Sequence, residues 1–121
     1  MDARPQPARD DAPAPLDFGG AVLVVVAEIP SGRVMTYGDV AAALGSRGAR
    51  AVGRVMAGEG SSLPWWRVVR ADARPPAGHE AAALEHYERE STPLRWRGPR
   101  GEPDAYRLDL AACRWAPEGV G

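Results

Sequence analysis

The 121-residue sequence has no lysine, one cysteine and two histidines, and these shortages exclude several kinds of chemistry. Cys113 has no second cysteine with which to form an internal disulfide. His79 and His86 add too few soft ligands to Cys113 for a structural zinc site. We therefore expect no metal and no cofactor.

Long hydrophobic runs are also missing. The longest apolar run spans seven residues, 21–27, and ends at Glu28, whereas a transmembrane helix needs roughly 20. No basic stretch leads into an apolar segment at the N-terminus, which argues against a secretory signal. We expect a cytoplasmic protein with no membrane partner.

What is present fits one small globular domain, with 45% hydrophobic and 26% charged residues. Residues 1–15 contain four prolines among small and charged residues, a composition typical of a disordered tail. Residues 116–121 are expected to fray. This leaves a domain over residues 16–115, expected to be a monomer.

Although the net charge of the chain is only −1, the middle of the sequence is basic. Residues 31–74 carry seven arginines against three acidic residues, a local charge of +4. The arginines are Arg33, Arg47, Arg50, Arg54, Arg67, Arg70 and Arg74, and the acids are Asp39, Glu59 and Asp72. Such a concentration of arginine suits a surface that contacts phosphates.

The spacing of apolar residues predicts three helices in the first half of the chain. Apolar positions from Phe18 to Ile29 favour a helix, although the valine run also suits a buried strand. Thr36 and Asp39 form a weak capping box for a helix through Leu44. A third helix, 49–57, is closed by Gly58 and carries arginines four residues apart on its outer side. The last two helices have the outline of a helix-turn-helix.

The second half of the chain predicts shorter elements. Residues 67–69 read as a strand, residues 79–90 as a helix that ends before Pro93, and residues 106–110 alternate as a half-buried strand does. The predicted fold is mainly α with a short β wing, a winged helix-turn-helix-like DNA-binding domain.

The most unusual feature is a pair of adjacent tryptophans. Trp65 and Trp66 stand between Pro64 and Arg67. One reading is structural, with one indole packed under the helices and the other on the surface. The other is that this segment forms a binding site.

Three motifs in order resemble the DNA-binding domain of O6-alkylguanine-DNA alkyltransferases over about residues 18–92. They are residues 29–41, Ile-Pro-Ser-Gly-Arg-Val-Met-Thr-Tyr-Gly-Asp-Val-Ala; residues 49–53, Ala-Arg-Ala-Val-Gly; and residues 64–69, Pro-Trp-Trp-Arg-Val-Val. In those enzymes the third motif reads Pro-Cys-His-Arg-Val, and its cysteine takes the alkyl group. Trp65 at the cysteine position is typical of alkyltransferase-like proteins, which bind the same lesions without removing them.

Chemistry independently argues against an enzyme. Alkyl transfer to a protein needs an activated thiolate. Trp65 offers no thiolate, and Trp66 in the histidine position offers no general base. Cys113 lies 48 residues beyond Trp65 and reads as a small buried or surface thiol.

The resemblance also implies roles for the residues of the first two motifs. Tyr37 would displace the phosphate beside the target nucleotide, and Arg50 would enter the base stack in place of the extruded base. Small residues around Arg50 would let the helix enter the minor groove. The predicted DNA-binding residues are Tyr37, Ala49, Arg50, Ala51, Gly53 and Arg54.

A lesion pocket is expected beside this helix. Its predicted residues are Pro64, Trp65, Trp66, Arg67 and Val68, with Arg70, Arg74 and His79 as candidates for the far wall. Glu90 resembles the enzymes' buried glutamate that pairs with the active-site histidine. With Trp66 at that position, Glu90 is expected only to salt-bridge an arginine.

Two functions remain open. The resemblance implies a non-enzymatic sensor that flips O6-alkylguanine in duplex DNA into a Trp-lined pocket and marks it for nucleotide excision repair proteins. The alternative is a winged-helix transcription regulator that binds undamaged DNA through Arg50 and Arg54. The tryptophan motif discriminates between them, because a regulator needs no base pocket beside its recognition helix.

Overall fold

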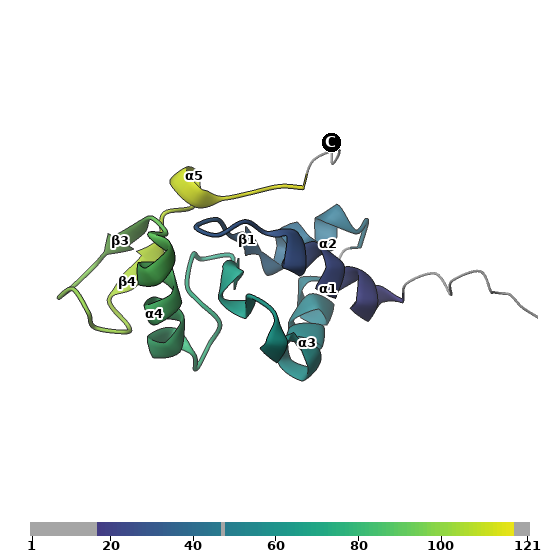
Figure 1. The fold of residues 1–121 in the computed structure, drawn as a ribbon, viewed down its shortest axis with the longest axis horizontal. Helices are drawn as coiled ribbons and strands as arrows, with labels where there is room; N and C mark the ends of the chain where they lie inside the picture. Colours follow the sequence, from purple (N-terminus) through teal and green to yellow (C-terminus); the bar gives the residue numbers. More distant parts are fainter. Residues whose placement is uncertain (1–16, 47, 118–121) are drawn as a thin grey trace, which may run out of the picture.

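The computed structural model describes residues 17–46 and 48–117. The predicted tail over residues 1–15 lies outside the described residues, as does most of the one over 116–121. The helices are α1 (Phe18–Glu28), α2 (Tyr37–Ala43), α3 (Ala49–Glu59), α4 (Glu80–Glu90) and α5 (Leu110–Cys113), with short 3-10 helices η2 (Gly60–Ser62) and η3 (Trp65–Arg67). The strands are β1 (Met35–Thr36), β2 (Val68–Val69), β3 (Leu94–Trp96) and β4 (Tyr106–Leu108). Figure 1 shows α1, α2 and α3 at one end of the molecule and α4 with the β3–β4 hairpin at the other.

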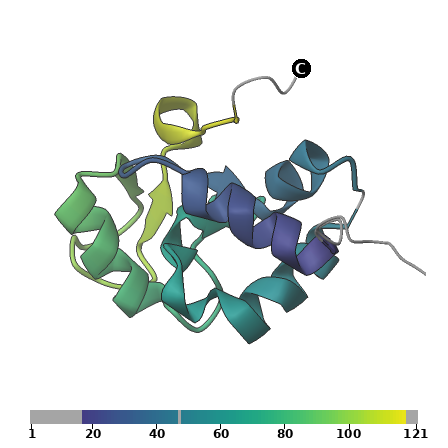
Figure 2. The same cartoon turned by 45° about the vertical axis from the view of Figure 1, so that its right-hand side comes forward.

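The apolar run after Phe18 forms a helix, so the alternative of a buried strand is wrong. Asp17 caps α1, since its carboxylate accepts a hydrogen bond from the Gly20 N–H at 2.7 Å. Val22 and Val26, one helical turn apart, are fully buried. Figure 2 shows α1 lying across the molecule beside α2 and above α3.

The predicted helix-turn-helix is formed by α2 and α3. The capping box is confirmed: the Thr36 hydroxyl accepts from the Asp39 N–H at 2.9 Å, and the Asp39 carboxylate accepts from the Thr36 N–H at 3.1 Å. The prediction that Gly58 closes α3 is wrong, because the helix continues to Glu59 with Gly60 as its C-cap. A Cβ at Gly60 would lie 2.9 Å from the terminal methyl group of Met56, so a larger residue there would make the Met56 side chain move.

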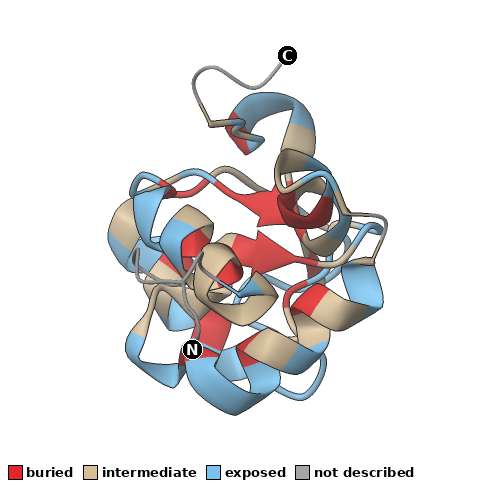
Figure 3. Ribbon diagram, turned by 90° about the vertical axis from the view of Figure 1, so that its right-hand side faces the viewer, coloured by how far each residue is buried: buried red, intermediate tan, exposed pale blue. Residues whose placement is uncertain are grey.

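A parallel pair of strands separates two hydrophobic cores. In the register of β1 and β2, Met35 pairs with Val68 and Thr36 with Val69. Successive residues of a strand point to opposite faces, and so Val68 belongs to the first core while Val69 belongs to the second. The first core lies among α1, α2 and α3, and the second lies between α4 and the hairpin. Buried positions gather at these central strands in Figure 3.

The C-terminal third differs in part from the sequence prediction. Helix α4 was expected, but β3 was not predicted; it pairs antiparallel with β4, with Leu94 opposite Leu108. The predicted strand over 106–110 ends at Leu108 instead, because Leu110 begins the short helix α5. The fold class, mainly α with a short β wing, is confirmed. No helix over residues 17–46 and 48–117 is long and apolar enough to cross a membrane.

Candidate nucleic-acid interface

Helix α3 presents arginines on the side opposite its core face. Val52 and Met56 are buried under the helix, while Arg50 and Arg54 are exposed. Neither arginine forms an ion pair with another residue in the described part of the chain. Of the predicted small residues, Ala49 is exposed, and Ala51 and Gly53 are half-buried. The helix therefore offers two cations that have no ion-pair partner among the described residues, on a backbone with little side-chain bulk.

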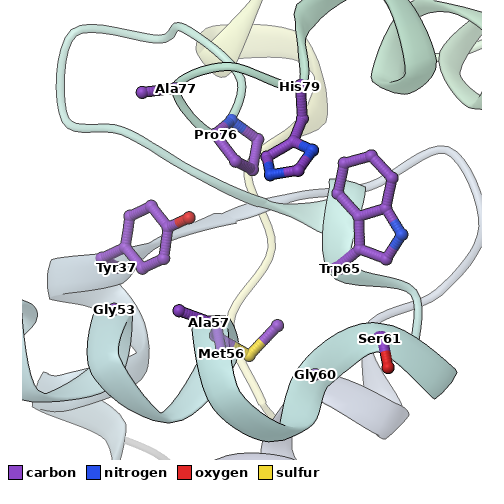
Figure 4. Close-up of a pocket in the computed structure, with 10 residues that line it drawn as sticks. All are labelled: Tyr37, Gly53, Met56, Ala57, Gly60, Ser61, Trp65, Pro76, Ala77 and His79. Carbon is purple, nitrogen blue, oxygen red and sulfur yellow. The ribbon is translucent and has the colours of Figure 1, made fainter.

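A cavity of about 350 Å³ opens beside α3. Figure 4 shows Tyr37 on one side, Trp65 on the other, the end of α3 below, and the segment before α4 above. The lining residues are Tyr37, Gly53, Met56, Ala57, Gly60, Ser61, Trp65, Pro76, Ala77 and His79. The helix-turn-helix and the tryptophan motif, far apart in sequence, thus share one cavity.

Pro64 sets the backbone that directs Trp65 to the cavity. Its φ of −73° and ψ of 68° are those of an inverse γ-turn, closed by the Trp65 N–H donating to the Leu63 carbonyl at 2.6 Å. The proline ring favours this φ in advance. The chain then continues as η3, with the Arg67 N–H donating to the Pro64 carbonyl.

Trp65 is a cavity residue and also a packing residue. Its ring is half-buried and contacts both hydrophobic cores. The centroid of its ring lies 5.5 Å from that of His79 and 5.6 Å from those of Trp66 and His86. The two readings of the tryptophan pair are therefore not exclusive for Trp65.

The other four residues predicted for the pocket are not among its lining residues. Pro64 forms the turn, and Val68 is fully buried in the first core. Trp66 stacks on His86 at 3.6 Å between centroids with an interplanar angle of 6°, and the Tyr87 hydroxyl donates to its carbonyl at 2.6 Å. Arg67 points toward α4. Among the five, only Trp65 lines the cavity, because consecutive residues of so tight a turn point in different directions.

Glu90 ties this turn to the rest of the molecule and has more partners than predicted. Its carboxylate accepts from the Arg67 guanidinium, from the Trp66 indole N–H at 3.0 Å and from the Gly32 N–H at 3.0 Å. The Arg67 guanidinium also donates to the Ile29 carbonyl at 2.8 Å. The expectation that Glu90 only salt-bridges an arginine is therefore wrong, since an indole can donate from residue 66 as an imidazole can.

Opposing effects set the pKa of Glu90. Burial by itself raises the pKa of this carboxyl, but the hydrogen bonds from Arg67, Gly32 and Trp66 outweigh it and hold the pKa below its ordinary value. Glu90 is thus charged at neutral pH and holds Trp66 in place.

Tyr37 opens α2 and forms part of the cavity wall. Burial raises the pKa of its phenol, and the nearby Arg70 guanidinium only partly opposes this rise. The hydroxyl is therefore neutral at physiological pH and can donate a hydrogen bond to a phosphate or a base.

The far wall was only partly predicted. Of its three candidates, His79 lines the cavity, whereas Arg70 and Arg74 form ion pairs with Asp72 and are not among the lining residues. Sequence reasoning missed six lining residues: Met56, Ala57, Gly60, Ser61, Pro76 and Ala77. The helical period could have placed Met56 and Gly60 on the inner side of α3, but nothing in the sequence shows where the 71–78 loop folds.

No thiol is among the residues that line the cavity. Cys113 is fully buried in the second core, and burial raises the pKa of its thiol to about 11. Among the described residues, no cluster of three or more His, Cys, Asp or Glu could hold a metal ion.

The fold and the site together define a helix-turn-helix DNA-binding domain with a cavity beside its second helix. Residues 17–91 match the family model of the 6-O-methylguanine DNA methyltransferase DNA-binding domain. The chain belongs to this family and is an alkyltransferase-like protein.

Curated relatives and solved structures agree with this family. The chain is 56% identical over 55 residues to a DNA base-flipping protein of Escherichia coli, covering 43% of each chain. It is 41% identical over 56 residues to one of Vibrio parahaemolyticus, covering 44% of this chain and 56% of that protein. The matches therefore span only about half the length of these relatives.

Two S. pombe structures share the fold. One is Atl1 in complex with damaged DNA containing O6-carboxymethylguanine, with a TM-score of 0.67 and 28% identity. The other is an ATL in complex with DNA, with a TM-score of 0.66 and 30% identity. Each comparison covers 83% of this chain and 95% of the S. pombe chain.

Proposed function

We propose that this protein is a non-enzymatic DNA damage sensor that binds duplex DNA through the minor groove and flips O6-alkylguanine into the cavity beside α3. The observation that carries the proposal is the cavity itself, in which Tyr37 and Gly53 of the helix-turn-helix face Trp65 of the third motif. The base-flipping relatives and the S. pombe protein bound to damaged DNA support it.

The cavity suits a flipped, alkylated base. Its volume of about 350 Å³ is within the range of small-ligand sites, and the Trp65 indole offers an apolar surface to an alkyl group. The Tyr37 hydroxyl, Ser61 and His79 offer polar contacts. With no thiol on the wall, the alkyl group stays on the base.

Arg50 is placed to fill the gap left by a flipped base. It is exposed at the start of α3, and a planar guanidinium can stack between bases and donate to the orphaned partner. Arg54 lies one turn further along the helix and would contact phosphate. Ala49, Ala51 and Gly53 leave room for the approach to a narrow groove.

A binding measurement tests the proposal. We expect the protein to bind a duplex with one O6-methylguanine more tightly than the unmodified twin, because a weakened base pair costs less to open. Affinity for both duplexes should fall with salt as arginines displace counterions. Equal affinity would favour the transcription regulator, since Arg50 and Arg54 suit either function.

A pair of arginine variants tests the role of Arg50. Arg50→Ala is expected to reduce the preference for the lesion, because stacking inside the duplex is lost. Arg95→Ala is the control, because this variant removes an equal charge from strand β3. Equal losses in the two variants would refute the stacking role.

The fate of the bound lesion is a further part of the proposal. The resemblance to alkyltransferase-like proteins supports a monomer in the cytoplasm that marks the site for nucleotide excision repair proteins. A reconstituted excision repair system tests this: adding the protein should increase incision beside O6-methylguanine, and the Arg50→Ala variant should not.

A further inference from the structure

The segment after α5 folds back over the start of the helix-turn-helix, as Figure 1 shows. The Val34 N–H donates to the Cys113 carbonyl at 2.9 Å, and the Trp115 N–H donates to the Val34 carbonyl at 2.8 Å. The Arg33 guanidinium donates to the carbonyls of Cys113 and Arg114. We call residues 113–115 the C-terminal strap; it lies beyond the span that the family model matches.

One side chain of the strap reaches the capping box of α2. Arg114 Nε donates to Asp39 Oδ2 at 2.8 Å, and its Nη2 donates to Oδ1 at 2.6 Å. Such two-pronged pairing fixes direction as well as distance. The same Oδ2 accepts from the Thr36 N–H, so one carboxylate serves both the strap and the helix cap.

This arrangement bears on Tyr37, the first residue of α2. Its backbone lies between the two residues of the capping box, and its ring lines the cavity. Without Arg114, the Asp39 carboxylate would lose the two hydrogen bonds that fix its direction, and it would carry an unpaired negative charge two residues from Tyr37. The start of α2 would also lose its link to the strap.

We propose that Arg114 is a positioning residue for lesion recognition: through Asp39 it holds the start of α2 so that Tyr37 stays at the cavity. The inference rests on the proposed function for its effect on binding. The Arg114 side chain is 55% exposed, so the pair can be removed without opening either core.

Hydrogen exchange tests the positioning in the full chain without DNA. In Arg114→Ala, the Asp39 N–H, which donates to the Thr36 hydroxyl, should exchange about fivefold faster relative to the amides of α4. The control is Arg95→Ala, which removes an exposed pair with Asp109 at 3.6 Å and should change nothing at α2. An unchanged Asp39 rate in Arg114→Ala overturns the inference.

The affinity ratio between an O6-methylguanine duplex and its unmodified twin tests the consequence. Arg114→Ala should lower this ratio about fivefold, Arg114→Lys should restore part of it, and Arg95→Ala should leave it unchanged. In an Asp39→Asn background, Arg114→Ala should have little further effect, because no carboxylate is left unpaired. General destabilisation would reduce binding to both duplexes equally and leave the ratio intact.

The outcomes separate this inference from the proposed function. If the wild type prefers the lesion and Arg114→Ala keeps the full preference, the positioning role is overturned. If the wild type shows no preference, the proposed function fails, and the exchange measurement still decides whether the strap holds α2.

Discussion

Trp65 has two roles that are usually separate. It lines the cavity, and its ring also packs against both hydrophobic cores. Trp65 therefore places an indole, with no nucleophilic thiol, on the cavity wall and at the same time joins the two hydrophobic cores. For any variant at this position, both the stability of the fold and the affinity for DNA must therefore be measured.

Trp65→Ala is expected to reduce both stability and lesion preference. Because the ring is half-buried, the loss in free energy of unfolding should be about 2–3 kcal/mol, below the 3–5 kcal/mol of a fully buried aromatic. The preference for O6-methylguanine over guanine should fall by about 1–3 kcal/mol. Thermal unfolding and binding to both duplexes measure the two effects.

Trp66→Ala is the matched control for Trp65→Ala. Trp66 stacks on His86 and donates to Glu90, away from the cavity. Its removal should destabilise the fold and leave the lesion preference of the folded protein intact. A preference lost in Trp66→Ala and kept in Trp65→Ala would reverse the assignment of the cavity wall.

Cys113 should accept neither an alkyl group nor a thiol reagent in the folded protein. It is fully buried, and burial raises the pKa of its thiol to about 11, so the thiol stays protonated at neutral pH. Intact mass after incubation with an O6-methylguanine oligonucleotide should be unchanged. A gain of one methyl would refute the non-enzymatic assignment, and a denatured sample treated with iodoacetamide confirms that the thiol is free.

At the scale of elements, α3 is a helix whose sequence contains unusually small residues. Gly53 and Gly58 both lie inside this helix, and a Cβ on either would meet no atom within 4 Å. Glycine costs stability inside a helix through its backbone entropy. Its presence at position 53, on the wall of the cavity, is consistent with close approach of DNA.

Two glycine variants of α3 test this interpretation. Gly53→Ala and Gly58→Ala should each raise the free energy of unfolding by about 0.5–1 kcal/mol. Only Gly53→Ala should weaken DNA binding, because its methyl group lies on the cavity side. Equal binding by the two variants would show that position 53 does not face DNA.

At the scale of the whole molecule, Glu90 connects three segments: helix α4, the turn over residues 64–67, and the turn after α1 that contains Gly32. Its carboxylate accepts from Arg67, Trp66 and Gly32. The Arg67 and Glu90 side chains are only 17% and 11% exposed. Removing one member leaves a largely buried partner unpaired, which is far more costly than losing a surface pair.

Glu90→Gln should therefore reduce the free energy of unfolding by about 3 kcal/mol at pH 7. The folded pKa of Glu90 lies below its ordinary value of 4.5, so its stabilisation is present above that value and is lost as the pH falls further. The difference between wild type and variant should shrink below about pH 4.5. Denaturant unfolding at pH 7 and pH 3 measures it, with Glu85→Gln, an exposed change on α4, as the control.

The sequence by itself determined the local features. Apolar spacing predicted α1, α3 and α4 to within a few residues, and the pair of Thr36 and Asp39 predicted the N-terminal cap of α2. The order of the three motifs indicated the family, and the absence of a thiol in the third motif led to the prediction that the site is non-catalytic. These features depend on residues that are close together in the sequence. Periodicity and capping patterns therefore reveal them without knowledge of the fold.

Tertiary structure alone decided how these elements share one site. The pairing of β1 with β2 brings the segment after Pro64 beside the start of α2, so that Trp65 and Tyr37 line the same cavity. The turn at Pro64 sends Trp66 and Arg67 to Glu90 instead of to the cavity. The loop before α4 closes the wall with Pro76 and His79. Contacts between residues far apart in the chain leave no periodic signal, because they depend on where each backbone turn directs the next side chain.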